Sequence, residues 1–304
     1  MYRVVKLSFT ARCTRSLISI NPYLIMKKRL LKYFLGVLTV FMLPGLVLAI
    51  DFANFTLSTP ETERTLILPQ RADKSPVVYL GSSIDPKTKE RVEGYAFIHY
   101  LRGGNAAKPP KASSCYTYLS SGAKWRGVEP WVVNPSNTKG LDSSFVLANL
   151  AGDIAKWEDA ADGIVGGGVS VDILGGGSSI NDVLVADMIS PDDKNEVYFA
   201  DVSSSGAIAV TIVWGIFGGP PSQRKLVEWD QVYDDVDFDW SASGEARKMD
   251  FENIATHELG HSVGMGDLYN SSCSLETMYG YASEGEINKR DLHTGDIAGI
   301  NKLY

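Results

Sequence analysis

The spacing of hydrophobic residues predicts one long helix near the middle of the chain. Over residues 143–161, apolar side chains from Val146 to Ala161 recur at helical spacing and form a single stripe. Asp142 or Ser143 is placed to cap the first turn with its side-chain oxygen. We therefore expect an amphipathic helix whose stripe packs on a core.

Short apolar runs, separated by glycine-rich and polar turns, predict a series of strands around this helix. The runs are Val77–Leu80, Gly94–Tyr100, Trp131–Val133, Val169–Leu174, Val183–Asp187, Glu196–Val202, Ala207–Trp214, Leu226–Asp230 and Val236–Trp240. The first two flank Asp85-Pro86-Lys87 and are expected to form a hairpin. Neither glycine run, at 166–168 or 175–177, has the spacing of a phosphate-binding loop.

The first 49 residues have the pattern of an export leader. Met26 is followed by three basic residues, and residues 33–49 form an uncharged apolar run that ends in Ala49. We expect cleavage after this run and export of the remainder. The alternative is an uncleaved membrane anchor through residues 33–49, which is short for a span. Residues 1–25 have no role in such a leader, and Met26 would be a natural start, so that we expect either an upstream extension or a misassigned start.

Charge is distributed unevenly along the chain. Residues 1–49 hold eight Lys or Arg and no Asp or Glu, so that 21 of the 29 basic residues and all 36 acidic residues lie in 50–304. That part has a formal net charge of −15. An acidic body of this kind argues against nucleic-acid binding, which requires a basic face.

Composition and cysteine content suggest two further segments after the leader. Residues 50–112 open and close with turn-forming residues and are expected to be a pro-region or a small subdomain, followed by a compact domain over 113–304. Outside the leader there are two cysteines, Cys115 and Cys273. In an oxidising compartment their simplest state is one disulfide, and the alternative is a pair of buried thiols.

The chemistry of the chain is concentrated in a second predicted helix that begins near residue 251. Its sequence contains His257 and His261, four residues apart, so that both imidazoles project from the same side. Two such nitrogens can bind one Zn²⁺ at about 2.0–2.1 Å. Glu258 is turned about 100° from His257 and can act on water without being a ligand. This is the H-E-x-x-H arrangement of zinc peptidases, with Glu258 as general base.

A catalytic zinc has three protein ligands and one open position. Gly264 is expected to end the helix and turn the chain, which brings Asp267 ten residues after His257. Asp267 is therefore the expected third ligand. The runner-up is His293, whose simpler interpretation is an exposed residue at the start of the last helix.

The string H-E-x-x-H-x-x-G-x-x-D resembles the long zinc motif of the metzincin peptidases, whose third ligand is usually His. A few metzincins, the snapalysin type, are similar in using Asp. The family also has a methionine turn beneath the zinc, and Thr277-Met278-Tyr279 resembles it. The last residues, 292–304, resemble the C-terminal helix of the matrixins, the matrix metalloprotease family. The resemblance implies that Met278 forms the floor of the site.

The chain departs from the matrixin pattern in three places. Gly295 stands where the first of two adjacent Asp residues is usual. Only His99 and His293 remain for a second, structural zinc, so that site is expected to be absent. The residues around Cys115 do not match the zinc-binding cysteine motif of matrixin pro-regions, so that the disulfide with Cys273 is preferred.

These observations predict an α+β fold, in which a twisted, mostly parallel sheet packs against two long helices and a smaller part with the methionine turn and last helix follows. The expected function is that of an exported zinc endopeptidase acting on protein or peptide substrates, with a membrane contact only if the leader stays attached. The alternative is a surface or binding protein that uses zinc for folding alone. The acidic run Asp234–Asp239 is interpreted first as a solvated strand edge, and the alternative is a calcium site formed by its carboxylate oxygens.

Overall fold

The computed structural model describes residues 64–70, 72, 75–103, 114–168 and 170–304. The predicted leader, residues 1–49, lies outside these residues. Among the helices that are described, none combines the length and the apolar character needed to cross a membrane.

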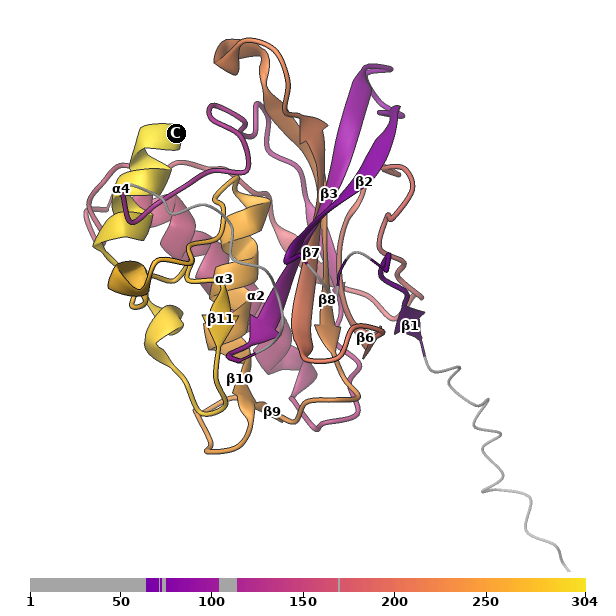
Figure 1. Ribbon diagram of the computed structural model, residues 1–304, viewed down its shortest axis with the longest axis vertical. Helices are drawn as coiled ribbons and strands as arrows, with labels where there is room; N and C mark the ends of the chain where they lie inside the picture. The colour runs from indigo at the N-terminus through magenta and orange to yellow at the C-terminus, as the bar shows by residue number, and fades with distance from the viewer. Residues whose placement is uncertain (1–63, 71, 73–74, 104–113, 169) are drawn as a thin grey trace, which may run out of the picture. The chain divides into compact units, whose positions relative to one another are not determined.

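Nine strands form one sheet, and β11, β3, β7, β8, β6, β4 and β5 follow one another across it, with β2 paired to β3 and β1 to β6 (Figure 1). The strands are β1 (Thr65–Leu66), β2 (Val77–Ile84), β3 (Arg91–Leu101), β4 (Trp131–Asn134), β5 (Gly177–Ser179), β6 (Asn195–Val202), β7 (Ala207–Ile216), β8 (Lys225–Asp234) and β11 (Tyr281–Ala282). Five of the eight pairings between these described strands are parallel. The three antiparallel pairings join β2, β3, β7 and β8.

Three α-helices and three short 3₁₀ helices complete the described secondary structure, together with a small ladder of β9 and β10. They are α2 (Ser143–Ala160), α3 (Phe251–Ser262), α4 (Thr294–Leu303), η3 (Pro221–Gln223), η4 (Ser271–Cys273), η5 (Asn288–Arg290), β9 (Trp240–Ser241) and β10 (Met249–Asp250). Asp142 caps α2 by accepting hydrogen bonds from the amides of Ser144 and Phe145. The α+β fold with a mostly parallel sheet and two long helices, expected from the sequence, is thus confirmed.

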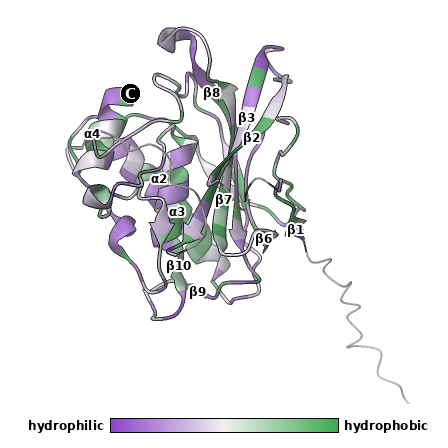
Figure 2. Ribbon diagram, in the orientation of Figure 1, coloured by the Kyte–Doolittle hydropathy of each residue, from purple (hydrophilic) through white to green (hydrophobic). Residues whose placement is uncertain are grey.

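Two hydrophobic cores lie on the two faces of the sheet. The larger includes the buried stripes of α2 and α3 with inward residues of β4, β6, β7 and β8. The smaller lies on the opposite face and includes alternate residues of β3 together with residues of β1, β6 and β7. Figure 2 shows hydrophobic colour along the central strands, as two buried faces require.

Two predicted strands before β6 and one after β8 do not form. Residues 170–174 and 183–187 are irregular, and their place beside β4 is taken by β5. Side chains satisfy the backbone there instead of a neighbouring strand: the amide of Val185 donates to Glu196 (3.2 Å), and that of Asp187 donates to Asp230 (2.8 Å). The hydrophobic pattern does not reveal such side-chain acceptors, so that a short apolar run alone was not enough to predict a strand.

The acidic run after β8 forms a turn rather than a strand. Oδ1 of Asp234 accepts hydrogen bonds from the amides of Val236 (3.0 Å) and Asp237 (2.6 Å), and Oδ2 accepts from Val202 (2.9 Å). Only Trp240 and Ser241 pair, with β10. Since backbone amides occupy both oxygens of Asp234, its carboxylate is already satisfied without calcium.

The expected N-terminal segment, residues 50–112, contributes the hairpin of β2 and β3 to the same sheet as the expected catalytic domain. β3 pairs with β7 from Glu93 opposite Gly215 to Tyr100 opposite Ala207. The described part of this segment thus shares a sheet with residues 114–304, and its role as a pro-region or small subdomain stays a prediction.

A disulfide joins Cys115 to Cys273, which are 158 positions apart in sequence, with 5.3 Å between their Cα atoms. This is the pairing expected from the sequence. It ties the segment that precedes β4 to η4, which follows the zinc helix α3.

A substitution at Gly260 tests how tightly side chains pack around α3. A Cβ atom there would lie 2.1 Å from Sδ of Met278 and 2.8 Å from the ring of Trp157, both fully buried. Gly260→Ala is expected to lower the free energy of unfolding by about 1–3 kcal/mol through overpacking, measured by denaturant titration. The matched control is Gly152→Ala on the exposed side of α2, where nothing lies within 4 Å. It should be neutral or raise stability by up to about 1 kcal/mol, and equal effects at both sites would contradict the packing account.

Candidate metal centre

The helix that carries the two predicted histidine ligands is fixed at both ends. At its N-terminus, the side chain of Asp250 accepts a hydrogen bond from the amide of Asn253 (3.1 Å). At its C-terminus, Val263 is the C-cap residue. Gly264 follows with a φ of 103°, a backbone conformation that residues with a side chain rarely adopt. Gly264 thus ends the helix and turns the chain back toward it, as expected from the sequence.

The structure brings the three predicted ligands together. Oδ1 of Asp267 lies 3.3 Å from Nε2 of His257 and 3.4 Å from Nε2 of His261. Ligand atoms placed tetrahedrally at about 2.0–2.1 Å from one zinc ion are themselves about 3.3–3.4 Å apart. Within the described part of the chain, Nε2 of His257 and Oδ1 of Asp267 are buried without a hydrogen-bond partner. The geometry and the unpaired buried atoms both fit a zinc ion.

The other nitrogen of each imidazole contacts a backbone carbonyl. Nδ1 of His257 lies 2.7 Å from the carbonyl oxygen of Thr277, and Nδ1 of His261 lies 3.0 Å from that of Met265. A carbonyl only accepts, so Nδ1–H donates in both rings and each Nε2 presents its lone pair toward Asp267. Backbone carbonyls therefore orient both rings as metal ligands require.

Burial and the mutual charges of the three residues determine their protonation. Burial lowers the pKa of His257 to about 4, so that its ring is neutral at pH 7. For His261 burial also lowers the pKa, but the neighbouring Asp267 carboxylate outweighs it and the pKa is raised. Burial alone would raise the pKa of Asp267, whereas the two imidazoles hold it below its ordinary value. Asp267 is thus a carboxylate, as a zinc ligand must be.

Glu258, the predicted general base, is fully buried beside these ligands. Oε2 accepts a hydrogen bond from the Thr211 hydroxyl on β7 (2.5 Å), and Oε1 lies 3.1 Å from Nδ1 of His99 on β3. Burial raises the pKa of Glu258 to about 7, which suits a group that must accept and release a proton near neutrality. No sequence pattern pointed to Thr211, and His99 stood out only as a histidine without another assigned role.

The predicted methionine turn lies directly below α3. Met278 is fully buried, and its side chain reaches the position where a Cβ of Gly260 would stand. Asp296 on α4 accepts hydrogen bonds from the amides of Thr277 (2.7 Å) and Met278 (3.2 Å). Met278 thus forms part of the packed floor beneath α3. The role of Asp296 was missed, because the sequence shows only its place near a helix start.

His293, the runner-up ligand, lies outside this cluster. It occupies the N-cap position of α4, and its Nε2 lies 3.0 Å from the carbonyl oxygen of Asn288. Its position is that of a residue at the start of the last helix, which was the simpler of the two interpretations.

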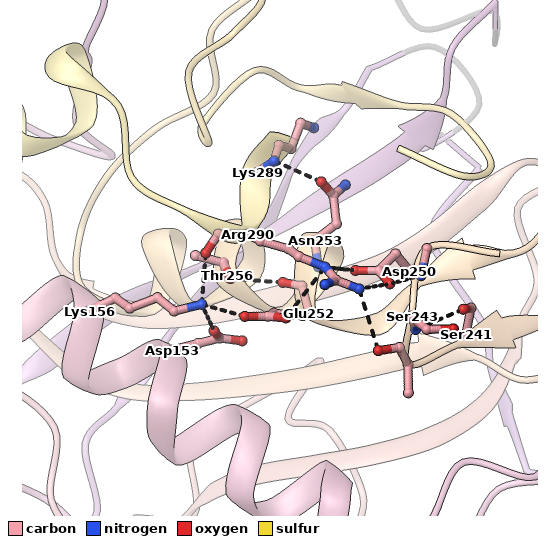
Figure 3. Close-up of polar contacts among 12 residues, drawn as sticks. Asp153, Lys156, Ser241, Ser243, Asp250, Glu252, Asn253, Thr256, Lys289 and Arg290 are labelled. Atoms are coloured by element: carbon pink, nitrogen blue, oxygen red, sulfur yellow. Dashed lines mark hydrogen bonds and ion pairs between the residues drawn. The ribbon is translucent and has the colours of Figure 1, made fainter. Parts of the chain in front are cut away.

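A polar network anchors η5 against α2 and α3 (Figure 3). Lys156 of α2 donates hydrogen bonds to Glu252 (2.6 Å) and to the carbonyl oxygen of Arg290 (2.7 Å). Arg290 pairs with Asp250 (2.6 Å), the N-cap of α3. The neighbouring Lys289 is fully buried, and its Nζ lies 3.0 Å from Nε2 of His99. Burial lowers the pKa of Lys289 to about 8.

Comparison with known proteins identifies the C-terminal part of the chain. Residues 223–304 match the family model for matrixin, Peptidase_M10. Human matrilysin is 41% identical over 70 residues, which cover 23% of this chain and 25% of that protein. Metalloendoproteinase 1-MMP of Arabidopsis thaliana is 41% identical over 69 residues (23% and 18%), and human matrix metalloproteinase-19 is 33% identical over 91 residues (29% and 17%).

The match thus spans a quarter or less of the length of these relatives. Among solved structures, metalloproteinase-II from Bacteroides fragilis is similar with a TM-score of 0.33 and 11% identity, covering 75% of this chain and 86% of that one. The matched residues 223–304 include α3, the three clustered ligand atoms, the methionine turn and α4. Residues 223–304, which hold the candidate metal centre, are therefore similar in sequence to the matrixins.

Proposed function

We propose that the protein is an exported zinc-dependent endopeptidase in which His257, His261 and Asp267 hold the metal and Glu258 is the general base. The observation that carries this proposal is the convergence of three ligand atoms at 3.3 and 3.4 Å, two of them buried and unpaired. The match of residues 223–304 to the matrixin family model supports the same activity. Export follows from the leader pattern of residues 1–49.

The residues around the metal position divide the chemistry between them. A zinc ion held there supplies Lewis acidity toward a peptide carbonyl and makes water more acidic. Glu258, with a pKa near 7, accepts a proton from water and returns it to the leaving amine. The Thr211 hydroxyl fixes one oxygen of that carboxylate and leaves the other for the reaction once His99 is removed from it. Asp267 adds a negative charge that a third histidine would not.

Loss of the third ligand is expected to weaken metal binding. Asp267→Asn removes the charged oxygen and should raise the dissociation constant for zinc by roughly tenfold or more, measured by competition with a chromogenic chelator. It should also reduce the increase in melting temperature that zinc gives the wild type. The control, Asp172→Asn at an exposed position, should bind zinc as the wild type does. Unchanged zinc affinity in Asp267→Asn would remove this residue from the ligand set.

Replacement of the general base separates catalysis from metal binding. Glu258→Gln keeps the size of the side chain but cannot accept a proton, so that kcat/KM for casein-derived peptides should fall by about 10²–10⁴ while one zinc per chain is retained. Because β3 covers Glu258, the assay uses the full zinc-loaded chain both intact and after cleavage between Leu101 and Ser114. The control is Glu284→Gln at an exposed position.

Zinc binding without hydrolysis in either form of the wild type would favour the alternative, a zinc-stabilised surface or binding protein. Full activity in Glu258→Gln would instead refute the role of this residue alone.

A further inference from the structure

The two carboxylate oxygens of Asp267 have different partners. Oδ1 lies 3.3 Å from Nε2 of His257 and 3.4 Å from Nε2 of His261, and it is buried without a hydrogen-bond partner among the described residues. Oδ2 lies 2.9 Å from the hydroxyl oxygen of Tyr269. A carboxylate only accepts hydrogen bonds, so the Tyr269 hydroxyl donates to Oδ2. One oxygen therefore faces the two imidazoles, and the protein engages the other.

The backbone beside the methionine turn fixes the position of Tyr269. The amide of Leu268 donates to the carbonyl oxygen of Met278 (2.8 Å), and the amide of Gly280 donates to the carbonyl oxygen of Leu268 (2.9 Å). A Cβ atom on Gly280 would lie 2.7 Å from the hydroxyl oxygen of Tyr269 and 2.5 Å from its Cζ atom. The ring thus packs closely on bare backbone, and Tyr269 is only 8% exposed. Its hydroxyl group is accordingly held in one direction.

A cavity of about 640 Å³ adjoins this pair, and both Asp267 and Tyr269 are among its lining residues. Water in such a cavity could solvate an exposed carboxylate from several directions. The side chain of Asp267, however, is only 6% exposed. The donor to Oδ2 is a hydroxyl group on a packed ring, which does not exchange as water does. The fold therefore sets the orientation of the carboxylate.

A carboxylate differs from an imidazole in the number of atoms that it can present to a metal. In His257 and His261 one ring nitrogen is held by a backbone carbonyl, and each ring is left with a single nitrogen for the metal. A carboxylate can bind through one oxygen or through both. A second oxygen would occupy a coordination position, whereas a catalytic zinc keeps one position open for water. With Oδ2 held by Tyr269, Asp267 resembles a third imidazole that presents one atom.

We infer that Tyr269 is a positioning residue that restricts Asp267 to one ligand oxygen and thereby keeps a coordination position of the metal open. This inference rests on the metal ligands of the proposed function. Tyr269 acts through Asp267 and not as a ligand. Its hydrogen bond to the carboxylate also draws on the negative charge that distinguishes Asp267 from a third histidine.

The alternative is that Tyr269 serves packing alone, since its ring also meets that of Tyr281 edge to face with 5.3 Å between ring centroids. Tyr269→Phe separates the two accounts, because it keeps the ring and removes only the hydroxyl group. Packing alone predicts unchanged metal binding. Positioning predicts that the freed Oδ2 of Asp267 turns toward the metal.

Cobalt provides the deciding measurement on the full chain, since the visible absorption of high-spin Co²⁺ weakens as its coordination number rises above four. Tyr269→Phe should still bind Co²⁺ but lose visible absorption intensity relative to the wild type. The matched control is Tyr95→Phe, which removes a hydroxyl group from the same cavity and should keep the wild-type spectrum. Circular dichroism of the metal-free variants checks that both are folded. An unchanged cobalt spectrum in Tyr269→Phe, or an equal change in both variants, would overturn the inference.

Zinc affinity tests whether Tyr269 acts through Asp267. Loss of a hydrogen bond to a ligand is expected to raise the dissociation constant for zinc roughly 10–100-fold, measured by competition with a chromogenic chelator. In an Asp267→Ala background, the same Tyr269→Phe change should alter this constant by about twofold at most, because the intervening carboxylate is gone. An effect of the same size in both backgrounds would contradict the positioning role.

These measurements also separate this inference from the proposed function. A wild-type chain that binds neither zinc nor cobalt would refute the metal centre and the inference together. A wild-type chain that binds zinc but hydrolyses no peptide would refute the peptidase function, whereas a weaker cobalt spectrum in Tyr269→Phe would still support the role of Tyr269. An active wild type with an unchanged spectrum in Tyr269→Phe would refute the role of Tyr269 alone.

Discussion

The two hydrogen bonds that Asp296 accepts from the amides of Thr277 and Met278 fix the loop on which the metal centre depends. They hold the Thr277 carbonyl where it accepts from Nδ1 of His257, and this contact turns Nε2 toward Asp267. The same loop places Met278 against the bare backbone of Gly260. The imidazole and the floor beneath it are thus positioned from α4, far along the chain from α3.

Burial of α3 on two sides gives the site its electrostatic character. The larger core covers one side of the helix, and β3 covers the side that presents His257, Glu258 and His261. Burial of an ionisable group is unfavourable unless the group has a polar or charged partner. Each of the three buried groups has one: Glu258 and Lys289 both contact His99, and Asp267 contacts His257. A divalent cation among two buried carboxylates would complete this balance of charge.

The two faces of β3 have different roles, which follows from the twofold period of a strand. Val92, Ala96 and Ile98 face the smaller core and are almost fully buried. Phe97 and His99 face the metal centre. The hairpin is therefore held both by apolar burial and by the contact with Glu258.

The sequence by itself pointed to the candidate metal ligands and to the main elements. His257, Glu258 and His261 lie on one helix, where a fixed spacing of four residues decides their geometry, and Gly264 and Asp267 follow within one turn of the chain. The stripe of α2 and the strands β4, β6, β7 and β8 could be read from periodicity, because each buries a face of regular period. The strands expected at 183–187 and 236–240 do not form, because side-chain carboxylates accept the hydrogen bonds of the backbone amides there.

Only the tertiary structure decided that Asp296 supports the methionine turn, that Lys289 and Thr211 reach the site, and that β3 lies across it. The contact of Thr211 with Glu258 joins residues 47 positions apart, and that of Lys289 with His99 joins residues 190 positions apart. Nothing in a local pattern encodes which distant strand edge a segment will pair with.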